Sequence, residues 1–521
     1  MAPRQGGFRV KESIRKRLAN AKRRIGRRLR PIQWQEQPRP MFSASNIQYE
    51  VAGRSRGLAA GGIGAMHMLA RRIGLIDRID KHVRVLKRHL PYHESDHVLN
   101  IAYNLLCGGT CMEHIEHRRN DEVYLDALGA QRIPDPTTEG DFCRRFESAQ
   151  QVELLMEAIN ETRLGVWKKQ PKQFFREAVI DGDGTLVETS AECKQGMDIA
   201  YNGKWGYQAL VVSLANTREP LYLLNRSGNR PSSEGAAEYL DRAALLCRRG
   251  GFRKIKFRGD TDFTQTRHLD RWDAEGITFV FGIAEMANLR EIAEKLPKRA
   301  YEPLQRRPKY EVKTRPRRRP KNVKEAIVRR REFENIRLKK EHTAEFDYRP
   351  TNCRKTYRVV VLRKTLSVER GQRLLFPRID YFFYITNDRK SSAAQIIFEA
   401  NDRCDQENLI GQLKSGANAL KVPVDNLLSN WAYMVMGALA WNLKAWAALL
   451  LPENGRWAKK HQDEKQTLLK MEFPTFLQTM IQIPAQIVRT GRRIVFRLLS
   501  WNPWQHVFFR LLDQLRLPMR C

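Results

Sequence analysis

The sequence is short of acidic residues, has few cysteines and contains no long uninterrupted apolar run. Its 8 cysteines are scattered over 521 residues, and without a dense disulfide framework they indicate a reducing, intracellular protein. The N-terminal stretch is basic throughout and has no apolar core of a signal peptide. The most hydrophobic run starts at Trp431 and is interrupted by Asn442 and Lys444, so we expect a buried helix and no membrane segment. Together these features predict a cytoplasmic protein.

The deficit of acidic residues leaves a large positive charge. Lys and Arg number 93 against 58 Asp and Glu, which gives a formal net charge of +35. Self-repulsion of this size destabilises a compact chain unless an anionic partner offsets it. Nucleic acid is the first candidate for that partner, and an anionic membrane surface is the second. The hydrophobic fraction of 42% indicates a folded protein, and the length is sufficient for two or three domains.

The chain divides by pattern into successive segments. Apolar residues at three- and four-residue spacing predict helices in the first half, in a domain suited to binding DNA. Strand patterns then follow in a row and afterwards alternate with helices, which is typical of an α/β fold with a mixed sheet. The predicted segments are a basic arm (1–54), a helical DNA-binding domain (55–172), the first part of an α/β core (173–290), a basic and β-rich insertion (291–395), the last part of the core (396–450) and a helical basic region (451–521).

The insertion carries dense positive charge between Arg306 and Lys340. A charge run of this kind is commonly a solvated face, but in a chain with a net charge of +35 we expect it to contact the DNA backbone. The candidate contacts within it are Arg317, Arg318, Arg319 and Lys321. The strand-like segment TYRVVVLRK (356–364) follows, with charges at interior positions. It is therefore predicted to be an edge strand or part of an extended hairpin.

Two of the predicted core strands end in pairs of aspartates. VIDGDGT contains Asp181 and Asp183, and KFRGDTD contains Asp260 and Asp262. Residues two apart on a strand share a face, so each pair offers two carboxylates to one space, at the sheet edge where ligands usually bind. The alternative is that these aspartates cap loops. Mg²⁺, with Mn²⁺ as a substitute, is the ion that would neutralise them, and two such ions serve phosphodiester chemistry.

A third acidic residue occurs in NDRCDQENLIGQLKSG (401–416). Arg403, Glu407 and Lys414 are spaced by four and seven residues, which brings them within about 40° of one line along an α-helix. Such a stripe is either a solvated row of salt bridges or one wall of an active site. The upstream aspartates favour the active site, because they would give Glu407 metal-binding partners.

These motifs together resemble the DDE transposases of bacterial insertion sequences, whose catalytic core has a ribonuclease-H-like fold. The family places its first Asp in a D-x-T context and its second at the end of the fourth strand. Its third acid is the Glu of a helical Tyr–Arg–Glu–Lys motif, whose tyrosine position is Ala400 in this chain. The residues that match the family pattern here are Asp183, Asp260, Arg403, Glu407 and Lys414.

The resemblance implies both a fold and a site. The fold would be α/β, with a ribonuclease-H-like mixed five-stranded sheet, a β-rich insertion, a helical N-terminal DNA-binding region and a helical C-terminal part. Two Mg²⁺ ions would be held by catalytic carboxylates, which are Asp183, Asp260 and Glu407, with Asp181 and Asp262 as the alternatives. Contacts to DNA would come from Arg403, Lys414 and Arg258, together with the basic residues of the insertion.

The implied function is that of a transposase that binds the terminal inverted repeats of its insertion sequence. It would cleave DNA in a metal-dependent reaction and transfer the strands to a target, as a cut-and-paste element does. Its partner would be double-stranded DNA, bound by a homodimer associated with the bacterial nucleoid. The alternatives are a catalytically silent DNA-binding protein derived from a transposase, or a structure-specific nuclease on the same fold.

Overall fold

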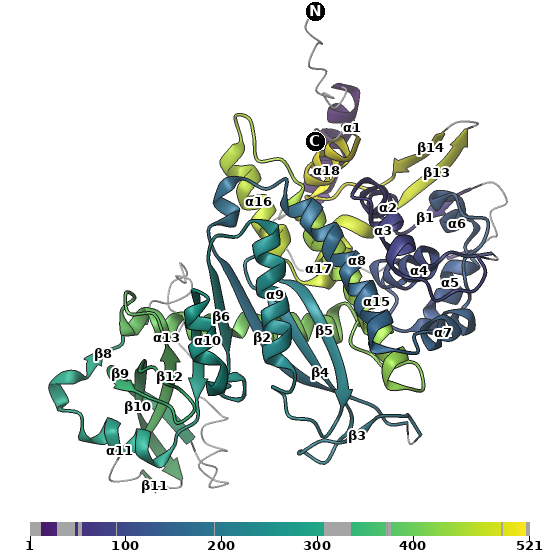
Figure 1. Ribbon diagram of the computed structural model, residues 1–521. Helices are drawn as coiled ribbons and strands as arrows, with labels where there is room; N and C mark the ends of the chain where they lie inside the picture. The colour runs from purple at the N-terminus through teal and green to yellow at the C-terminus, as the bar shows by residue number, and fades with distance from the viewer. Residues whose placement is uncertain are drawn as a thin grey trace, which may run out of the picture. The chain divides into compact units, whose positions relative to one another are not determined.

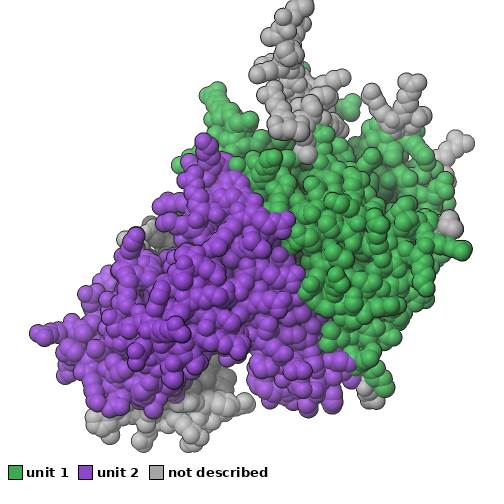
Figure 2. Space-filling view, in the orientation of Figure 1, with its two compact units in different colours: residues 1–170, 191–195, 411–521 green, residues 171–190, 196–410 purple. Residues whose placement is uncertain are grey.

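The computed structural model describes residues 12–28, 47–49, 55–89, 91–191, 193–306, 335–370, 372–373, 377–490 and 493–516. The chain forms two compact units, coloured separately in Figure 2. Unit 1 comprises residues 1–170, 191–195 and 411–521, and unit 2 comprises residues 171–190 and 196–410. Both units are therefore assembled from segments that lie far apart in the sequence.

Unit 1 is mainly helical and is organised around α15 (Leu427–Leu449), whose side chains are buried from Ser429 onward. Asn426 caps this helix by accepting a hydrogen bond from the Ser429 amide. The helices α2, α4, α7, α8 and α16 pack against it. The helices of unit 1 are α1 (Glu12–Arg28), α2 (Ile63–Arg72), α3 (Leu75–His82), α4 (Glu94–Leu106), α5 (Ile115–Arg119), α6 (Glu122–Leu128), α7 (Pro136–Arg144), α8 (Ala149–Trp167), α15, α16 (Ala458–Lys470), α17 (Phe473–Phe476) and α18 (Gln505–Arg516).

The polar residues that interrupt the apolar run of α15 have partners inside unit 1. The Lys444 ammonium donates to the Leu469 carbonyl at 2.9 Å and lies 3.9 Å from the ring centroid of Trp441. Asn442 accepts a hydrogen bond from Arg163 of α8 at 3.1 Å. The prediction of a buried helix is thus confirmed. None of the helices in the described ranges combines the length and the apolar character that a membrane crossing requires.

The C-terminal part is not entirely helical, which corrects the sequence-based expectation. The strands β13 (Ala485–Thr490) and β14 (Arg493–Leu498) pair antiparallel, and β1 (Gly57–Leu58) pairs with β13. Ala485 and Ile487 are buried while Gln486 and Val488 are more exposed, which is the two-residue alternation of a strand. Basic residues within the segment obscure this alternation in the sequence, and helical segments flank it on both sides.

In the described residues, unit 2 is built on a mixed sheet of 11 strands. Its core order is β5–β4–β2–β6–β7, in which β2 pairs antiparallel with β4 and parallel with β6, and β6 pairs parallel with β7. The expected α/β fold with a mixed sheet is therefore confirmed. The strands are β2 (Ala178–Glu188), β3 (Asp198–Ile199), β4 (Trp205–Leu214), β5 (Glu219–Ser227), β6 (Ile255–Gly259), β7 (Ile277–Ile283), β8 (Glu302–Pro303), β9 (Asn335–Tyr348), β10 (Tyr357–Arg370), β11 (Gln372–Arg373) and β12 (Arg378–Thr386).

The strands of the insertion continue the core sheet, because β12 pairs antiparallel with β7. Strand β10 lies between β9 and β12, so it belongs to a long hairpin, as expected, but it is not an edge strand. Its valines at 359–361 are fully buried. The charged residues that suggested an edge have their own partners, and the Arg363 guanidinium lies 4.1 Å from the ring centroid of Tyr301.

Different helices cover the two faces of the core sheet. On one face α9 (Ala236–Gly250) lies across β2, β4 and β5 (Figure 1), and Trp272 of α10 (Leu269–Ala274) makes an edge-to-face contact with Phe257 of β6. On the other face, α13 (Ala393–Asp402) buries Ile396 and Ile397 among residues of β7 and β10. This second face carries the candidate site.

Candidate active site

Strand β2 presents its aspartates to one face of the sheet and its glycines to the other. Asp181 and Asp183 lie on the face of α13, two residues apart. A Cβ on Gly184 would stand 2.8 Å from the Ser232 side chain, closer than such atoms pack. The alternation of aspartate and glycine thus places carboxylates on one side of β2 and allows the chain to pack closely on the other.

Asp181 is fully engaged by Arg258 of the neighbouring strand β6. The guanidinium donates to both carboxylate oxygens at 2.7 Å, and both side chains are buried. Burial raises the pKa of Asp181, although its hydrogen bonds to Arg258 act in the opposite direction. Arg258 also donates to the Glu399 carbonyl of α13 at 3.0 Å. Arg258 is therefore a buried residue that joins β2, β6 and α13, and its expected contact with DNA stays a prediction.

Asp183 lies in a different environment from Asp181. Its carboxylate accepts a hydrogen bond from Arg403 at 3.2 Å, and its side chain is 13% exposed. Burial raises the pKa of Asp183 to about 6, with Arg403 opposing the shift and the negative charges of Asp260 and Glu407 adding to it. Asp183 is thus a partly buried carboxylate within the electrostatic reach of both other acids of the expected motif.

Asp260 follows directly after β6 and begins the short 3-10 turn Thr261–Phe263. One of its oxygens accepts a hydrogen bond from the Asp262 amide at 3.0 Å, so the loop-capping alternative describes part of its role. Burial raises the pKa of Asp260, and the charge of Arg403 opposes that shift. Asp262 is exposed. Of this pair, Asp260 is the residue that, like Asp183, is affected by the charge of Arg403.

Glu407 lies on α14 (Cys404–Gly411), which follows α13 after a break at Arg403. Buried Gln406 fastens α14 to the sheet by donating to the Val211 carbonyl of β4 at 2.9 Å and bonding to the Ser213 hydroxyl. Next to it, Asp405 pairs with Arg218 at 2.8 Å. These contacts hold Glu407 on the face of the sheet that carries Asp183.

Arg403 bridges two of the expected acids. One guanidinium nitrogen lies 3.2 Å from Asp183 and another lies 3.1 Å from Glu407, as the four-residue spacing of Arg403 and Glu407 predicts. Lys414 lies in unit 1, in the π-helical segment Gln412–Gly416, where the angular spacing of an α-helix no longer applies. The insertion residues Arg317, Arg318, Arg319 and Lys321 lie outside the described residues.

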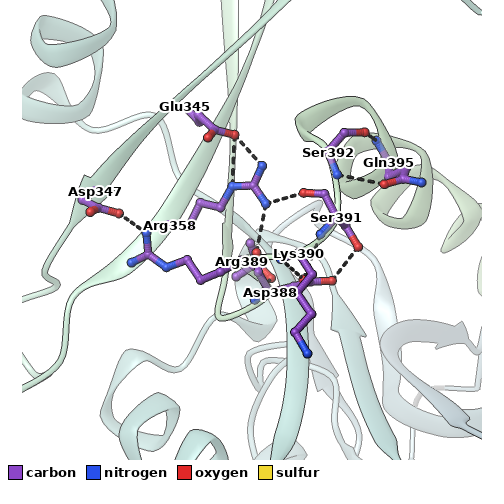
Figure 3. Close-up of polar contacts among 10 residues, drawn as sticks. Glu345, Asp347, Arg358, Asp388, Arg389, Lys390, Ser391, Ser392 and Gln395 are labelled. Carbon is purple, nitrogen blue, oxygen red and sulfur yellow. Dashed lines mark hydrogen bonds and ion pairs between the residues drawn. The ribbon is translucent and has the colours of Figure 1, made fainter.

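The start of α13 is fixed by an arginine that no sequence motif singled out (Figure 3). Arg358 of β10 donates to the carbonyls of Asp388 at 2.9 Å and Ser391 at 2.6 Å, and it pairs with Glu345 of β9. Ser392 then caps α13 by accepting from the Gln395 amide. The signal in the sequence is a charge inside a valine-rich strand, which by itself is equally typical of an edge strand.

The donor set suits a hard divalent cation. Asp183, Asp260 and Glu407 offer carboxylate oxygens, which Mg²⁺ prefers, and a cation beside them would offset the burial that raises the pKa of both aspartates. Within the described ranges, no group of three or more His, Cys, Asp or Glu side chains is arranged so as to hold a metal ion. Arg403 supplies the positive charge between two of these carboxylates in the structure.

Comparisons with known proteins give a family for most of the chain. A family model described as "Transposase DDE domain group 1" matches residues 40–519. No curated protein matches the sequence. Among solved structures, the chain is similar to that of the piggyBac transposase synaptic complex with hairpin DNA, with a TM-score of 0.38 and 10% sequence identity over 81% of this chain and 82% of that chain.

Proposed function

This chain belongs to the DDE transposases of group 1, and we propose that it moves an insertion sequence by metal-dependent DNA cleavage and strand transfer. The protein would bind the terminal inverted repeats of its element, cut there, and join the ends to target DNA. The observation that carries this proposal is the meeting of Asp183, Arg403 and Glu407 on one face of the core sheet, with the charge of Asp260 acting on Asp183.

Each residue of the site has a distinct part in this proposal. Asp183, Asp260 and Glu407 would hold two Mg²⁺ ions, which when bound activate the attacking oxygen and stabilise the leaving one. Arg403 would bind a phosphate of the DNA, for which a planar guanidinium is well suited. Gln406 would keep α14 against β4 and so orient Glu407 toward the sheet.

The proposed partner is double-stranded DNA, from both the element ends and the target. The net charge of +35 supports this partner, because contacts to phosphate account for most of the affinity of such proteins for DNA. Lys414 and the basic residues of the insertion, at positions 317–319 and 321, would add phosphate contacts. We further propose that the protein acts as a homodimer on DNA, in the bacterial cytoplasm and in association with the nucleoid.

Neutral substitutions of the three acids test the proposed function. In Asp183→Asn, Asp260→Asn and Glu407→Gln we expect Mg²⁺-dependent cleavage of DNA flanking the gene to fall by at least about a thousandfold. Binding of the same DNA should stay within a few-fold of the unaltered protein, because phosphate contacts do not depend on these groups. Asp262→Asn is the matched control, since its side chain is exposed. Full activity in any of the three test variants would refute its assignment.

The products of the same assay separate the alternative functions. A transposase gives cleaved ends and also joined products with target DNA. Cleavage without joining would indicate a structure-specific nuclease on this fold. Binding of the ends without any cleavage, with Mg²⁺ or with Mn²⁺, would indicate a silent DNA-binding descendant of a transposase.

A further inference from the structure

The Arg403 side chain contacts carboxylate oxygens that a bound metal ion would also need as ligands. Its guanidinium donates to Oδ2 of Asp183 and to Oε1 of Glu407, at 3.2 and 3.1 Å. These oxygens belong to the carboxylates that would hold the metal under the proposed function. A cation and a guanidinium cannot both be the close partner of the same carboxylate oxygens, so the two must compete for them.

The bridge joins different elements of unit 2. Asp183 lies on β2, Glu407 lies on α14, and Arg403 lies at the break between α13 and α14. The Arg403 side chain is 18% exposed and that of Glu407 is 57% exposed. The guanidinium therefore ties the helix to the strand from a place that solvent, and hence a ligand, can reach.

A DNA phosphate is the ligand that can draw Arg403 away from this bridge. A guanidinium binds a phosphate through two parallel, charge-assisted hydrogen bonds, as it binds a carboxylate. A phosphate can therefore replace the carboxylates as the anionic partner of Arg403. The exchange frees the oxygens of Asp183 and Glu407 and removes a positive charge from between them. Both effects favour the binding of a divalent cation at those carboxylates.

We propose that Arg403 is a latch that keeps the acidic site closed to metal until DNA binds, an inference that rests on the proposed function. In the free chain Arg403 bridges Asp183 and Glu407 and weakens metal binding. On the complex it holds a phosphate, and the carboxylates take the metal. DNA therefore raises the affinity for metal, and by thermodynamic reciprocity metal raises the affinity for DNA by the same factor. The device restricts the assembly of the cutting site to chains already on DNA.

Direct measurement of Mn²⁺ binding tests the latch without reference to activity. Free and bound Mn²⁺ are distinguished by electron paramagnetic resonance, with the full-length chain alone or with short duplex DNA of arbitrary sequence. In Arg403→Gln we expect Mn²⁺ affinity without DNA to rise about tenfold, equivalent to about 1.4 kcal/mol. DNA should raise Mn²⁺ affinity in the unaltered chain and have a much smaller effect in this variant.

Further variants separate the bridge from a general effect of charge. Arg403→Lys keeps the charge but cannot span two carboxylates with a planar fork, so its Mn²⁺ affinity should also exceed that of the unaltered chain. Lys204→Gln is the matched control, because it removes a positive charge from an exposed ion pair with Glu188 at the far end of β2. It should leave Mn²⁺ affinity unchanged. Asp183→Asn should lose the Mn²⁺ site in every background.

Each outcome tests either the latch or the proposed function on which the latch rests. Equal Mn²⁺ affinities in the unaltered chain and Arg403→Gln would overturn the latch, provided that binding still depends on Asp183. An Arg403→Lys variant that behaves like the unaltered chain would also overturn it, because charge alone would then explain the effect. If no chain shows Mn²⁺ binding that depends on Asp183, with or without DNA, the proposed metal site itself is wrong.

Discussion

At the scale of single residues, Asp181 and Asp183 on β2 have different charged partners, although burial raises the pKa of both. Asp181 is neutralised by a bidentate partner, Arg258, and both are buried. Arg403 pairs with both Asp183 and Glu407, and the negative charge of Asp260 raises the pKa of Asp183 further. A carboxylate that shares one cation with other acids is poorly compensated for burial. This is why Asp183, and not Asp181, is the better candidate for a metal ligand.

The raised pKa of Asp183 predicts how its charge affects stability. Its pKa is about 6 in the folded chain, against an ordinary value of 3.8, so the folded state binds the proton more tightly. The resulting contribution to stability is complete below the ordinary pKa and is lost as pH rises through about 6. We expect Asp183→Asn to raise the free energy of unfolding by about 1–3 kcal/mol near pH 8 and by almost nothing near pH 4.

Urea unfolding at both pH values measures this difference. The asparagine resembles the protonated aspartate, so the two proteins should converge in acid and diverge above neutrality. Asp262→Asn is the control, since its side chain is exposed and should show no such divergence. A stability difference that is the same at both pH values would contradict the assigned environment of Asp183.

At the scale of elements, the helices α13 and α14 are held by contacts that reach them from the sheet. Arg358 fixes the start of α13, Lys256 pairs with Glu399 near its end at 2.9 Å, and Gln406 fastens α14 to β4. The β-rich insertion supplies the first of these contacts through β10. The insertion therefore stabilises the helix that leads to Arg403 and Glu407, whatever contact it makes with DNA.

Removal of the Arg358 side chain tests this role of the insertion. Arg358→Ala leaves the carbonyls of Asp388 and Ser391 without their partner, and we expect a loss of about 2–4 kcal/mol in the free energy of unfolding. The neighbouring Arg389 pairs with Asp347, and both side chains are mostly exposed (Figure 3). Arg389→Ala should therefore cost less than about 1 kcal/mol. Equal losses in the two variants, measured by urea unfolding, would show that Arg358 is not an anchor.

At the scale of the whole molecule, the positive charge should make DNA binding strongly dependent on salt. A plot of the logarithm of the binding constant against that of salt concentration should be steep, with a slope of about −0.9 for each phosphate that the protein neutralises. If the insertion binds DNA, neutralising Arg317, Arg318, Arg319 and Lys321 together should make the slope shallower by about one unit for each of these side chains that pairs with a phosphate. Fluorescence anisotropy of labelled duplex DNA measures both slopes.

A matched pair of basic residues on α9 controls for the removal of charge alone. Arg248 and Arg249 are exposed on the helix that covers the face of the sheet opposite the site. Substituting both with Gln should leave the slope of the unaltered protein unchanged. If this double substitution makes the slope shallower by as much per charge as substitution of the insertion residues does, the insertion has no special part in binding DNA.

The sequence predicted the local features of the site well, because short-range periodicity encodes them. Asp260 directly after β6 and an Arg–Glu pair four residues apart are visible without any tertiary contact. The expectation that the other strand ends at Asp181 and Asp183 is wrong, because pairing with β4 continues β2 to Glu188. The order of strands and helices in the core was predictable for the same reason. The family resemblance depended on just these features, and residues 40–519 match its model.

The sequence by itself determined that Asp260 follows a core strand, the helical pairing of Arg403 with Glu407, and a charge that calls for an anionic partner. Only the tertiary structure decided which aspartate of β2 is neutralised, because Arg258 reaches Asp181 across a parallel strand pairing. It also placed β10 inside the sheet, through the pairing of β12 with β7. Such pairings join residues far apart in the chain, and no local pattern encodes the hydrogen bonds that select them.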